Sequence, residues 1–354
     1  MGIIKNIGYI FTLCVVTLCV DFVNAQDPNL SMFYNNPMFY NPAMTAYASG
    51  FGLKVNARNQ WHPIQGKFNT VIASFESEVV NRFGLGLIGL SDVAGEGLLK
   101  TTAGYINYSY RPIDTKKGFV QFGMSGGYVS KSIDWKRLTF SDQYDEVLGK
   151  VNPTAFLAPS YNSISYPDVG FGLCGQFQGK SRIVGLMKKW MLTGGAGFHH
   201  LNRPKDAFFQ DKNHLPIKTV FHVKAYALLG DYASTFATIF ENQNRFRTLT
   251  FGANIHNQNL NLGAWVRNKN VLGIGSFDSF IFSLGTYLPL SNKKSIRITY
   301  SVDFTISRLR TSSFWSHEIA LVYGIDNFYL LRGFQEKRNR DRKTQCPSEF
   351  KVFD

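Results

Sequence analysis

The sequence lacks a long hydrophobic run beyond its first 25 residues. A membrane-spanning helix needs roughly 20 consecutive apolar residues, so the sequence predicts no such helix in the rest of the chain. Cysteine is also scarce: only Cys174 and Cys346 follow residue 25, which excludes a framework of disulfides. Charged residues make up only 18% of the chain and hydrophobic residues 44%, a balance that excludes wholesale disorder.

The first 25 residues have the features of a secretory signal peptide. Lys5 supplies a positive charge, residues 8–20 form an apolar core, and Val23-Asn24-Ala25 provides a cleavage site. The apolar core is about 13 residues long, which is short of the roughly 20 that a spanning helix requires. We therefore expect export, cleavage near Ala25 and a mature chain that begins at Gln26.

Aromatic residues and period-two alternation are abundant. The chain is 15% aromatic, with 31 Phe and 17 Tyr. Between Ile296 and Ser307, apolar and polar residues alternate strictly, as in a strand whose side chains point to two faces in turn. Several such runs reach the length of about 9–11 residues that a membrane-spanning strand needs, whereas strands of soluble proteins average about 5–6 residues. About fourteen candidate strands follow from this pattern, at residues 51–60, 67–76, 82–91, 98–110, 119–131, 168–177, 189–201, 219–229, 232–240, 247–256, 260–267, 278–288, 296–307 and 315–324.

The connections favour a barrel with both ends in the periplasm, because outer loops of such barrels are longer than periplasmic turns. The fifth connection, about residues 132–167, is the longest and the seventh, at 202–216, is next, although a long sixth connection at 178–188 does not fit. We predict an all-β fold, a transmembrane outer-membrane β-barrel of about 14 antiparallel strands. The barrel occupies residues 51–332, after a signal peptide at 1–25 and an N-terminal plug-like segment at 26–50, and before a basic periplasmic C-terminal tail at 333–354.

Two glycine-rich strings resemble functional motifs. Gly84 to Gly89 matches GxGxxG, and Gly123 to Gly127 matches GxSxG. Both motifs function only where a strand turns into a helix, whereas each string here lies inside a predicted strand. Glycines on the lumen face of a strand leave room for a plug or for tight curvature. We therefore expect no enzymatic activity, no catalytic residue and no cofactor.

The histidines do not predict a metal site. His199, His200, His214 and His222 fit no compact ligand spacing, and neighbouring residues on a strand face opposite sides. We interpret His200 as an interfacial or loop residue.

The formal net charge of +14 does not point to nucleic acid. The basic residues are scattered over turns and the tail and form no patch on a nucleic-acid-binding fold, which favours acidic lipid or an acidic partner. Lys224, Arg297 and Asp303 fall on polar strand faces. They form either a neutralised network in the lumen or a transport pathway.

The stretch from Gln26 to Met44 contains two Asn-Pro steps and four aromatic residues. Proline fixes its own backbone and pushes the preceding residue toward extended conformations, so these steps impose two stiff bends before the first strand. The aromatic residues can then pack inside the barrel or against its periplasmic mouth. We predict a plug whose central residues are Asp27, Pro28, Phe33, Tyr34, Asn36, Pro37, Phe39, Tyr40, Asn41 and Pro42.

The same stretch closely resembles the mature start of the PorP/SprF family, outer-membrane proteins of the Bacteroidetes type IX secretion and gliding machinery. Met32, Met38 and Ala46-Tyr47 depart from the residues expected there. The resemblance covers nearly the whole mature chain. It continues in Arg58-Asn59-Gln60-Trp61, Gly84-Leu85-Gly86, Asp92-Val93-Ala94-Gly95, Leu138-Thr139-Phe140-Ser141-Asp142-Gln143, His200-Leu201-Asn202-Arg203-Pro204, Ser316-His317-Glu318-Ile319 and Cys346-Pro347.

The resemblance implies a Gram-negative outer-membrane barrel, in contact with lipid and lipopolysaccharide, that binds secreted surface adhesins through their C-terminal secretion domain. Such a protein serves in export or surface anchoring and supports gliding motility. The alternatives are a transporter of small solutes and an adaptor to periplasmic secretion components through Arg338, Arg340, Arg342 and Lys343. Aromatic residues often anchor protein interfaces. The candidate cargo-contact residues in the outer loops are Trp135, Phe140, Tyr144, Phe156, Tyr161 and Tyr166.

Overall fold

The computed structural model describes residues 27–48, 50–61, 68–80, 82–95, 98–115, 117–145, 147–159, 161–179, 187–208, 213–229, 232–257, 259–269, 277–291, 293–306, 315–326, 328 and 330–331. The predicted signal peptide at 1–25 and the predicted tail at 333–354, with Arg338, Arg340, Arg342 and Lys343, lie outside the described residues.

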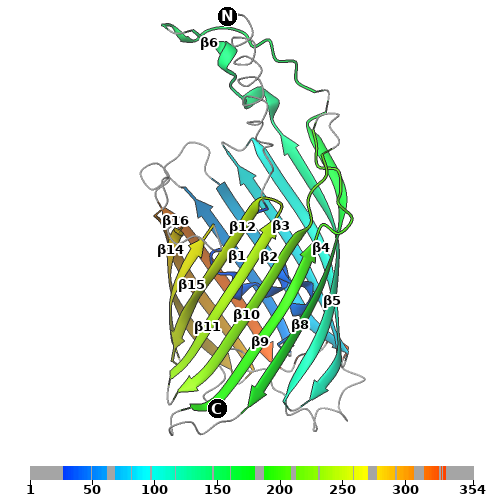
Figure 1. Ribbon diagram of the computed structural model, residues 1–354, viewed down its shortest axis with the longest axis vertical. Helices are drawn as coiled ribbons and strands as arrows, with labels where there is room; N and C mark the ends of the chain where they lie inside the picture. The colour runs from blue at the N-terminus through cyan, green and yellow to red at the C-terminus, as the bar shows by residue number, and fades with distance from the viewer. Residues whose placement is uncertain are drawn as a thin grey trace, which may run out of the picture.

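Within the described residues, fourteen antiparallel strands close into one barrel (Figure 1). Every strand pairs with its neighbours along the chain, and the first pairs with the last to close the ring, with Phe51 opposite Ile325. The strands are β1 (Gly50–Gln60), β2 (Phe68–Val80), β3 (Phe83–Ala94), β4 (Leu99–Thr115), β5 (Gly118–Ile133), β8 (Ser163–Gly179), β9 (Met187–His199), β10 (Lys218–Leu229), β11 (Tyr232–Gln243), β12 (Phe246–His256), β13 (Leu260–Asn268), β14 (Phe277–Ser291), β15 (Lys294–Thr305) and β16 (Trp315–Asp326).

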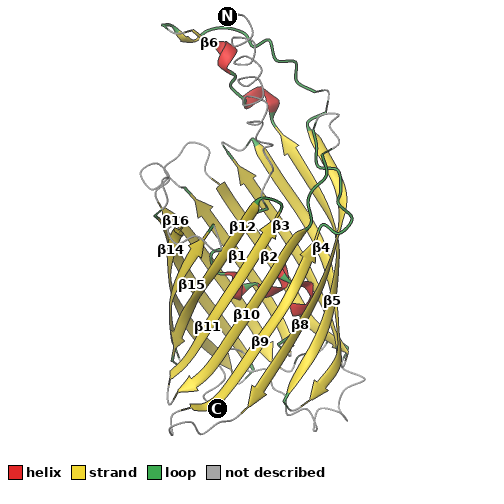
Figure 2. Cartoon of the chain, in the orientation of Figure 1, coloured by secondary structure: helices red, strands yellow, loops and turns green. Residues whose placement is uncertain are grey.

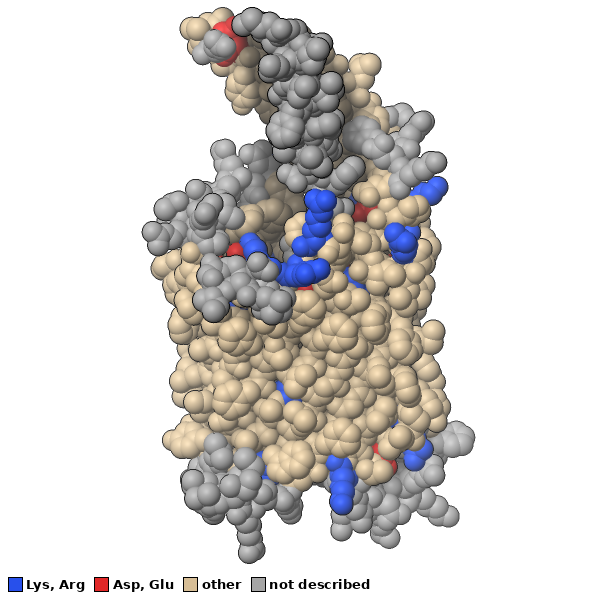
Figure 3. Space-filling view, viewed as in Figure 1, with Lys and Arg blue, Asp and Glu red and all other residues tan. Residues whose placement is uncertain are grey.

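The strand faces are inverted relative to a soluble sheet. On β15, Thr299, Ser301 and Asp303 are buried in the lumen, whereas Tyr300 between them is exposed. The outward-facing residues of the other strands include large exposed apolar side chains such as Ile106 and Phe282. On the face shown in Figure 3, Lys and Arg gather mostly near the two ends, and uncharged residues form a broad belt between them. A lumen that is polar and a belt that is apolar are what lipid around the barrel requires.

The lengths of the connections indicate how the barrel is oriented in the membrane. The two longest connections, residues 134–162 and 200–217, leave the same end of the barrel, which is therefore the outer end. Residues 82, 117 and 293 belong to the short turns of the other, periplasmic end. Most of the sixth connection, predicted at 178–188, lies outside the described residues, and 244–245 is a short turn on the outer side.

Each of the fourteen predicted strands corresponds to one observed strand, so the barrel prediction is confirmed. The observed strands are mostly longer, reaching 17 residues in β4 and β8. No helix among the described residues is long and apolar enough to span a membrane. The chain ahead of β1 instead forms three short helical turns, η1 (Phe33–Asn35), α2 (Pro37–Tyr40) and η2 (Pro42–Met44), which lie inside the barrel (Figure 2).

Candidate functional site

Residues 27–48, here called the inner segment, run through the lumen from its outer half to the periplasmic start of β1 (Figure 2). Each Asn-Pro step begins a helical turn, with Pro37 and Pro42 at the first helical positions of α2 and η2. Proline fits there because its fixed φ suits the first turn and its missing N–H is not needed. Asn41 caps η2, since its Oδ1 accepts a hydrogen bond from the amide of Ala43 at 2.9 Å.

The outer end of the inner segment is bound through Asp27. Its Oδ2 lies 2.8 Å from Nε2 of His200, and Nδ1 of His200 lies 2.9 Å from Oδ2 of Asp168 on β8. His200 is the first residue after β9 and so belongs to the seventh connection, which agrees with its interpretation as an interfacial or loop residue, and its side chain is buried. Burial opposes charge on this imidazole, but the carboxylates of Asp27 and Asp168 outweigh burial and raise the pKa of His200 to about 9. Burial also opposes charge on Asp27, yet His200 holds the pKa of that carboxyl well below its usual range.

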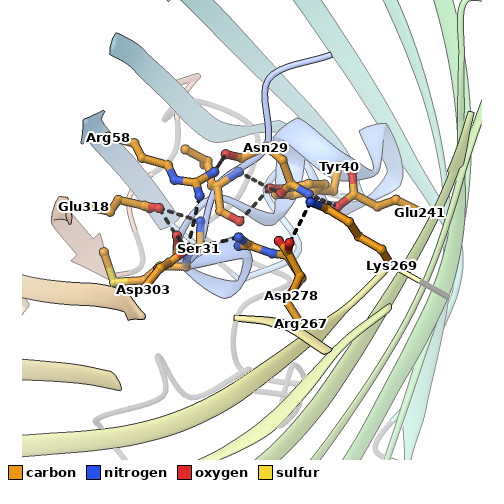
Figure 4. A network of polar contacts seen from close by, with 12 residues as sticks. Asn29, Ser31, Tyr40, Arg58, Glu241, Arg267, Lys269, Asp278, Asp303 and Glu318 are labelled. Atoms are coloured by element: carbon orange, nitrogen blue, oxygen red, sulfur yellow. Dashed lines mark hydrogen bonds and ion pairs between the residues drawn. The ribbon is translucent and has the colours of Figure 1, made fainter. Parts of the chain in front are cut away.

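Charged side chains of β1, β13, β15 and β16 bind the next stretch of the inner segment (Figure 4). Asp303 Oδ2 lies 3.1 Å from Nη2 of Arg58 and 3.0 Å from Nη1 of Arg267, and it accepts a hydrogen bond from the Ser31 hydroxyl at 2.8 Å. Arg58 also donates to the carbonyl of Asn29. All three charged groups are buried, and the one carboxylate offsets one of the two arginine charges inside the lumen.

Glu318 on β16 extends this network. Its Oε2 accepts hydrogen bonds from the amides of Ser31, at 2.6 Å, and Met32, at 3.3 Å. Its Oε1 accepts from Asn56 Nδ2 at 3.0 Å. A second carboxylate, Glu241, accepts from Asn29 Nδ2 at 2.8 Å and pairs with Lys218 at 3.0 Å. The network thus fixes both the backbone and the side chains of the inner segment.

Aromatic side chains fill the centre of the lumen. Tyr34 stacks on Trp265 of β13 with ring centroids 5.0 Å apart, and Phe33 meets the same indole edge-on at 5.4 Å. The Tyr34 hydroxyl lies 3.2 Å from that of Ser283 on β14. Two of the predicted plug aromatics therefore pack against one buried tryptophan of the barrel.

The opposite wall contacts the inner segment mainly at its backbone. The carbonyl of Thr45 accepts hydrogen bonds from Ser109 Oγ at 2.8 Å and from Gln121 Nε2 at 2.7 Å. The carbonyl of Tyr47 accepts from Arg111 Nη2 at 2.9 Å. Satisfying these carbonyls allows irregular backbone to lie inside a barrel at membrane depth.

The three lumen residues singled out from the sequence do not come together. Asp303 lies in the charged network. The Lys224 ammonium lies 3.4 Å from the hydroxyl of Tyr47, and Arg297 lines a cavity at the periplasmic mouth. Their surroundings resemble a neutralised lumen more than a continuous pathway. The pairing of Asp303 with Arg58 and Arg267 and the contacts of Glu318 are not predicted from the sequence.

Some of these contacts involve residues of the sequence motifs that resemble the PorP/SprF family. Five residues of those motifs lie against the inner segment: Arg58, Gly84, Gly86, His200 and Glu318. These motifs are scattered in sequence but converge on one element in space.

The histidines contact the inner segment separately and share no common centre. His199 Nε2 donates to the carbonyl of Tyr40 at 2.9 Å, and His222 Nε2 lies 2.9 Å from Asn41 Nδ2. His214 instead bonds to the carbonyl of Arg203 in an outer loop. Among the described residues, no group of three or more His, Cys, Asp and Glu side chains is placed to hold a metal ion.

The fifth connection is a folded outer loop with its own aromatic core. It contains η3 (Trp135–Arg137), η4 (Ser141–Gln143) and the hairpin of β6 (Tyr144–Asp145) and β7 (Gly149–Lys150), which stands beyond the rim in Figure 1. Phe156 stacks on Phe140 at 4.4 Å and lies 5.8 Å from Trp135. Three of the six predicted contact residues therefore pack inside the loop.

The exposed apolar surface of this loop differs from the predicted one. Tyr144 and Tyr161 are exposed, as expected for contact residues. Tyr166 is only 5% exposed and lies in β8, because the strand begins at Ser163 and continues through Pro167. Three aliphatic residues outside the predicted contact set are the most exposed: Val147 at 88%, Leu148 at 72% and Leu157 at 90%.

Solved structures with a similar fold are outer-membrane barrels of very different sequence. A FadL homologue of Pseudomonas aeruginosa has 11% identity and a TM-score of 0.46, covering 81% of this chain and 92% of that one. The toluene transporter TodX of Pseudomonas putida has 9% identity and a TM-score of 0.41, covering 82% and 93%. Omp33 of Acinetobacter baumannii has 7% identity and a TM-score of 0.37, covering 80% and 100%. Likeness at this level carries no argument about function.

Comparison at the level of sequence is more specific. A search of curated proteins finds no match to this chain. The family model of the type IX secretion system membrane protein PorP/SprF matches residues 22–323, which is most of the chain. The match includes the inner segment and almost the whole barrel. The chain therefore belongs to the PorP/SprF family of type IX secretion system membrane proteins.

Proposed function

We propose that this outer-membrane barrel binds a secreted surface adhesin, through the C-terminal secretion domain of that cargo, and serves its export or its anchoring in support of gliding motility. The observation that carries the proposal is the exposed apolar surface of the fifth connection. Val147, Leu148 and Leu157 are largely exposed to solvent on a loop that extends outward from the rim. Exposed apolar side chains on an ordered element are typical of protein-binding surfaces.

The loop is braced in a way that suits binding. Asp142 accepts hydrogen bonds from the amide of Ala155 at 2.6 Å and from the Thr154 hydroxyl at 2.9 Å. Asp145 accepts from the amides of Val147 and Leu148, both at 2.9 Å, at the hairpin tip. A braced loop loses less conformational entropy on binding than a loose one, which favours affinity.

The lumen supports this function over passage of small solutes. The inner segment contacts the barrel wall on opposite sides, at Asp303 of β15 and at Leu173 of β8, whose carbonyl accepts from Asn41 Nδ2 at 3.1 Å. The long connections that face the exterior are the remaining surface for a large cargo. The predicted basic tail is proposed to meet periplasmic secretion components, because the described chain ends with Leu330 and Leu331 bonded to the periplasmic end of β2.

The test is purification of the tagged protein from its native outer membrane, followed by measurement of the adhesin that copurifies. Val147→Asn, Leu148→Asn and Leu157→Asn together should lower copurification and surface display at least about tenfold, because buried interface anchors are each worth about 1 kcal/mol or more. The matched control is Lys136→Gln with Arg137→Gln, which alters exposed residues of the same loop without removing apolar surface.

Two outcomes contradict the proposal. One is wild-type adhesin display by the triple variant or by cells that lack the protein. The other is solute flux through liposomes containing the wild-type protein, with no copurifying adhesin, which would favour the transporter.

A further inference from the structure

Three glycines stand side by side on the lumen wall beneath the inner segment. Gly123 of β5 is opposite Gly172 of β8, which is in turn opposite Gly197 of β9. All three are buried and face the lumen. We call Gly123, Gly172 and Gly197 the glycine row. It forms a recess with no side chains across three adjacent strands.

The inner segment fills this recess with its own backbone. A Cβ atom added at Gly172 would lie 2.8 Å from the amide nitrogen of Ala43, and one added at Gly123 would overlap the carbonyl of Pro42. One added at Gly197 would overlap the carbonyl of Tyr40 and lie 3.1 Å from Cα of Asn41. At Gly123 and Gly197 the nearest atoms are main-chain atoms, so a side-chain rotation could not relieve the clash. At Gly172 the added Cβ atom would overlap Oδ1 of Asn41 and also crowd the Ala43 amide nitrogen, so rotation of the Asn41 side chain would relieve only part of the clash.

The recess continues toward β3 along the same direction of the wall. Gly123 is opposite Ser109 of β4, and Ser109 is opposite Gly84 of β3. A Cβ atom added at Gly84 would lie 2.8 Å from Cβ of Ala46. Ala43 and Ala46 of the inner segment therefore lie against glycines of the wall.

We infer that the glycine row is a seat that positions residues 41–43 and so holds the inner segment across the lumen. This inference goes beyond binding of cargo at the outer loops and does not depend on it. The seat recognises a tight Asn-Pro-Ala turn whose backbone approaches the wall more closely than a Cβ atom allows. The glycines act as positioning residues because their missing side chains are what admits the turn.

The native thiol of Cys174 reports whether the seat is occupied. Cys174 lies two residues beyond Gly172 on the same face of β8, and its Sγ is 3.2 Å from the carbonyl oxygen of Ala43. Only 1% of this residue is exposed. A water-soluble maleimide therefore reaches Cys174 only when the turn leaves the seat.

The experiment measures the rate of maleimide labelling at the Cys174 peptide of the full-length protein in membranes, by mass spectrometry. Gly172→Ala and Gly123→Ala should each raise the rate about tenfold or more, because overpacking forces the backbone apart. Gly104→Ala and Gly126→Ala are matched controls, since a Cβ atom added at either glycine meets nothing within 4 Å. Both controls should label at the wild-type rate.

A substitution in the inner segment tests the same contact in case the glycine variants fail to assemble into a barrel. Ala43→Leu leaves every strand unaltered and should also raise the rate about tenfold or more, because the added atoms have no space in the seat. Wild-type labelling rates in Ala43→Leu and in whichever glycine variants assemble would overturn the inference. Equal acceleration in the two control variants would also overturn it, since the effect would then not belong to the seat.

Discussion

The two opposite walls of the lumen bind the inner segment by different means. On β1, β13, β15 and β16 the contacts are made by long charged side chains, centred on Asp303 and Glu318. On β5, β8 and β9 the backbone of the inner segment packs against the glycine row, and side chains such as those of Gln121 and His199 bond to its carbonyls. The first wall contacts the inner segment through its side chains, and the second leaves space for the inner segment because it has glycines there.

The difference determines which change each wall tolerates. A charged network is sensitive to removal of a group, because the partners that remain are left buried and unpaired. A glycine recess is sensitive to addition of a group, because the space is already filled by main chain. The two walls therefore respond to opposite kinds of substitution, and the responses can be separated.

The largest effect is expected from Asp303→Ala. This change leaves Arg58 and Arg267 buried without their shared carboxylate, so the free energy of unfolding should fall by about 3–5 kcal/mol. Urea unfolding in lipid vesicles measures it. Cys174 should remain protected from maleimide at low urea, because the glycine row is unchanged. Labelling as fast as in Gly172→Ala would mean that the two walls act as one unit.

Asp278→Ala is the matched control for this substitution. Asp278 pairs with Lys269 at 2.6 Å, but the Lys269 side chain is 57% exposed. Because such partly solvated pairs contribute little, the loss should be about 0–1 kcal/mol. A loss as large as that of Asp303→Ala would show that burial of the arginines is not what distinguishes the central network.

The sequence predicts the wall itself better than the contacts on it. Strict alternation on β15 identifies the lumen face, because one face must be polar and the other must meet lipid. Alternation does not say which residues lie at the same height, so the pairing of Arg58 with Asp303, 245 positions apart, is visible only after the barrel closes. The predicted strand begins at residue 168, whereas β8 begins at Ser163 and includes Pro167, so the sequence pattern places the start of this strand five residues too late.

A smaller effect is expected from Glu318→Gln. The amide keeps the shape of the carboxylate but supplies one acceptor oxygen in place of two, so a donor among Ser31, Met32 and Asn56 loses its partner. Stability should fall by about 1–3 kcal/mol. Hydrogen exchange should accelerate at the amides of Ser31 and Met32. The amide of Ala43, which donates to Asn41, should exchange at the wild-type rate. Faster exchange at the Ala43 amide would show that loss of a contact at one wall also loosens the inner segment at the other wall.

The smallest effect is a pH dependence at the outer end, where His200 joins the inner segment to the glycine-row side of the lumen through Asp168 of β8. The folded-state pKa of His200 is about 9, above the unfolded value of about 6.5, so its contribution is fully present below about pH 6.5 and is lost as the pH rises through 9. Between about pH 8 and pH 10 the stability advantage of wild type over His200→Gln should shrink by about 1 kcal/mol. Urea unfolding at each pH measures this difference, with His214→Gln as a control, because His214 is exposed and its Nδ1 bonds to the carbonyl of Arg203 within its own loop. An advantage that stays constant with pH would show that the charge of His200 contributes nothing to holding Asp27, and that the outer end of the inner segment is held by shape alone.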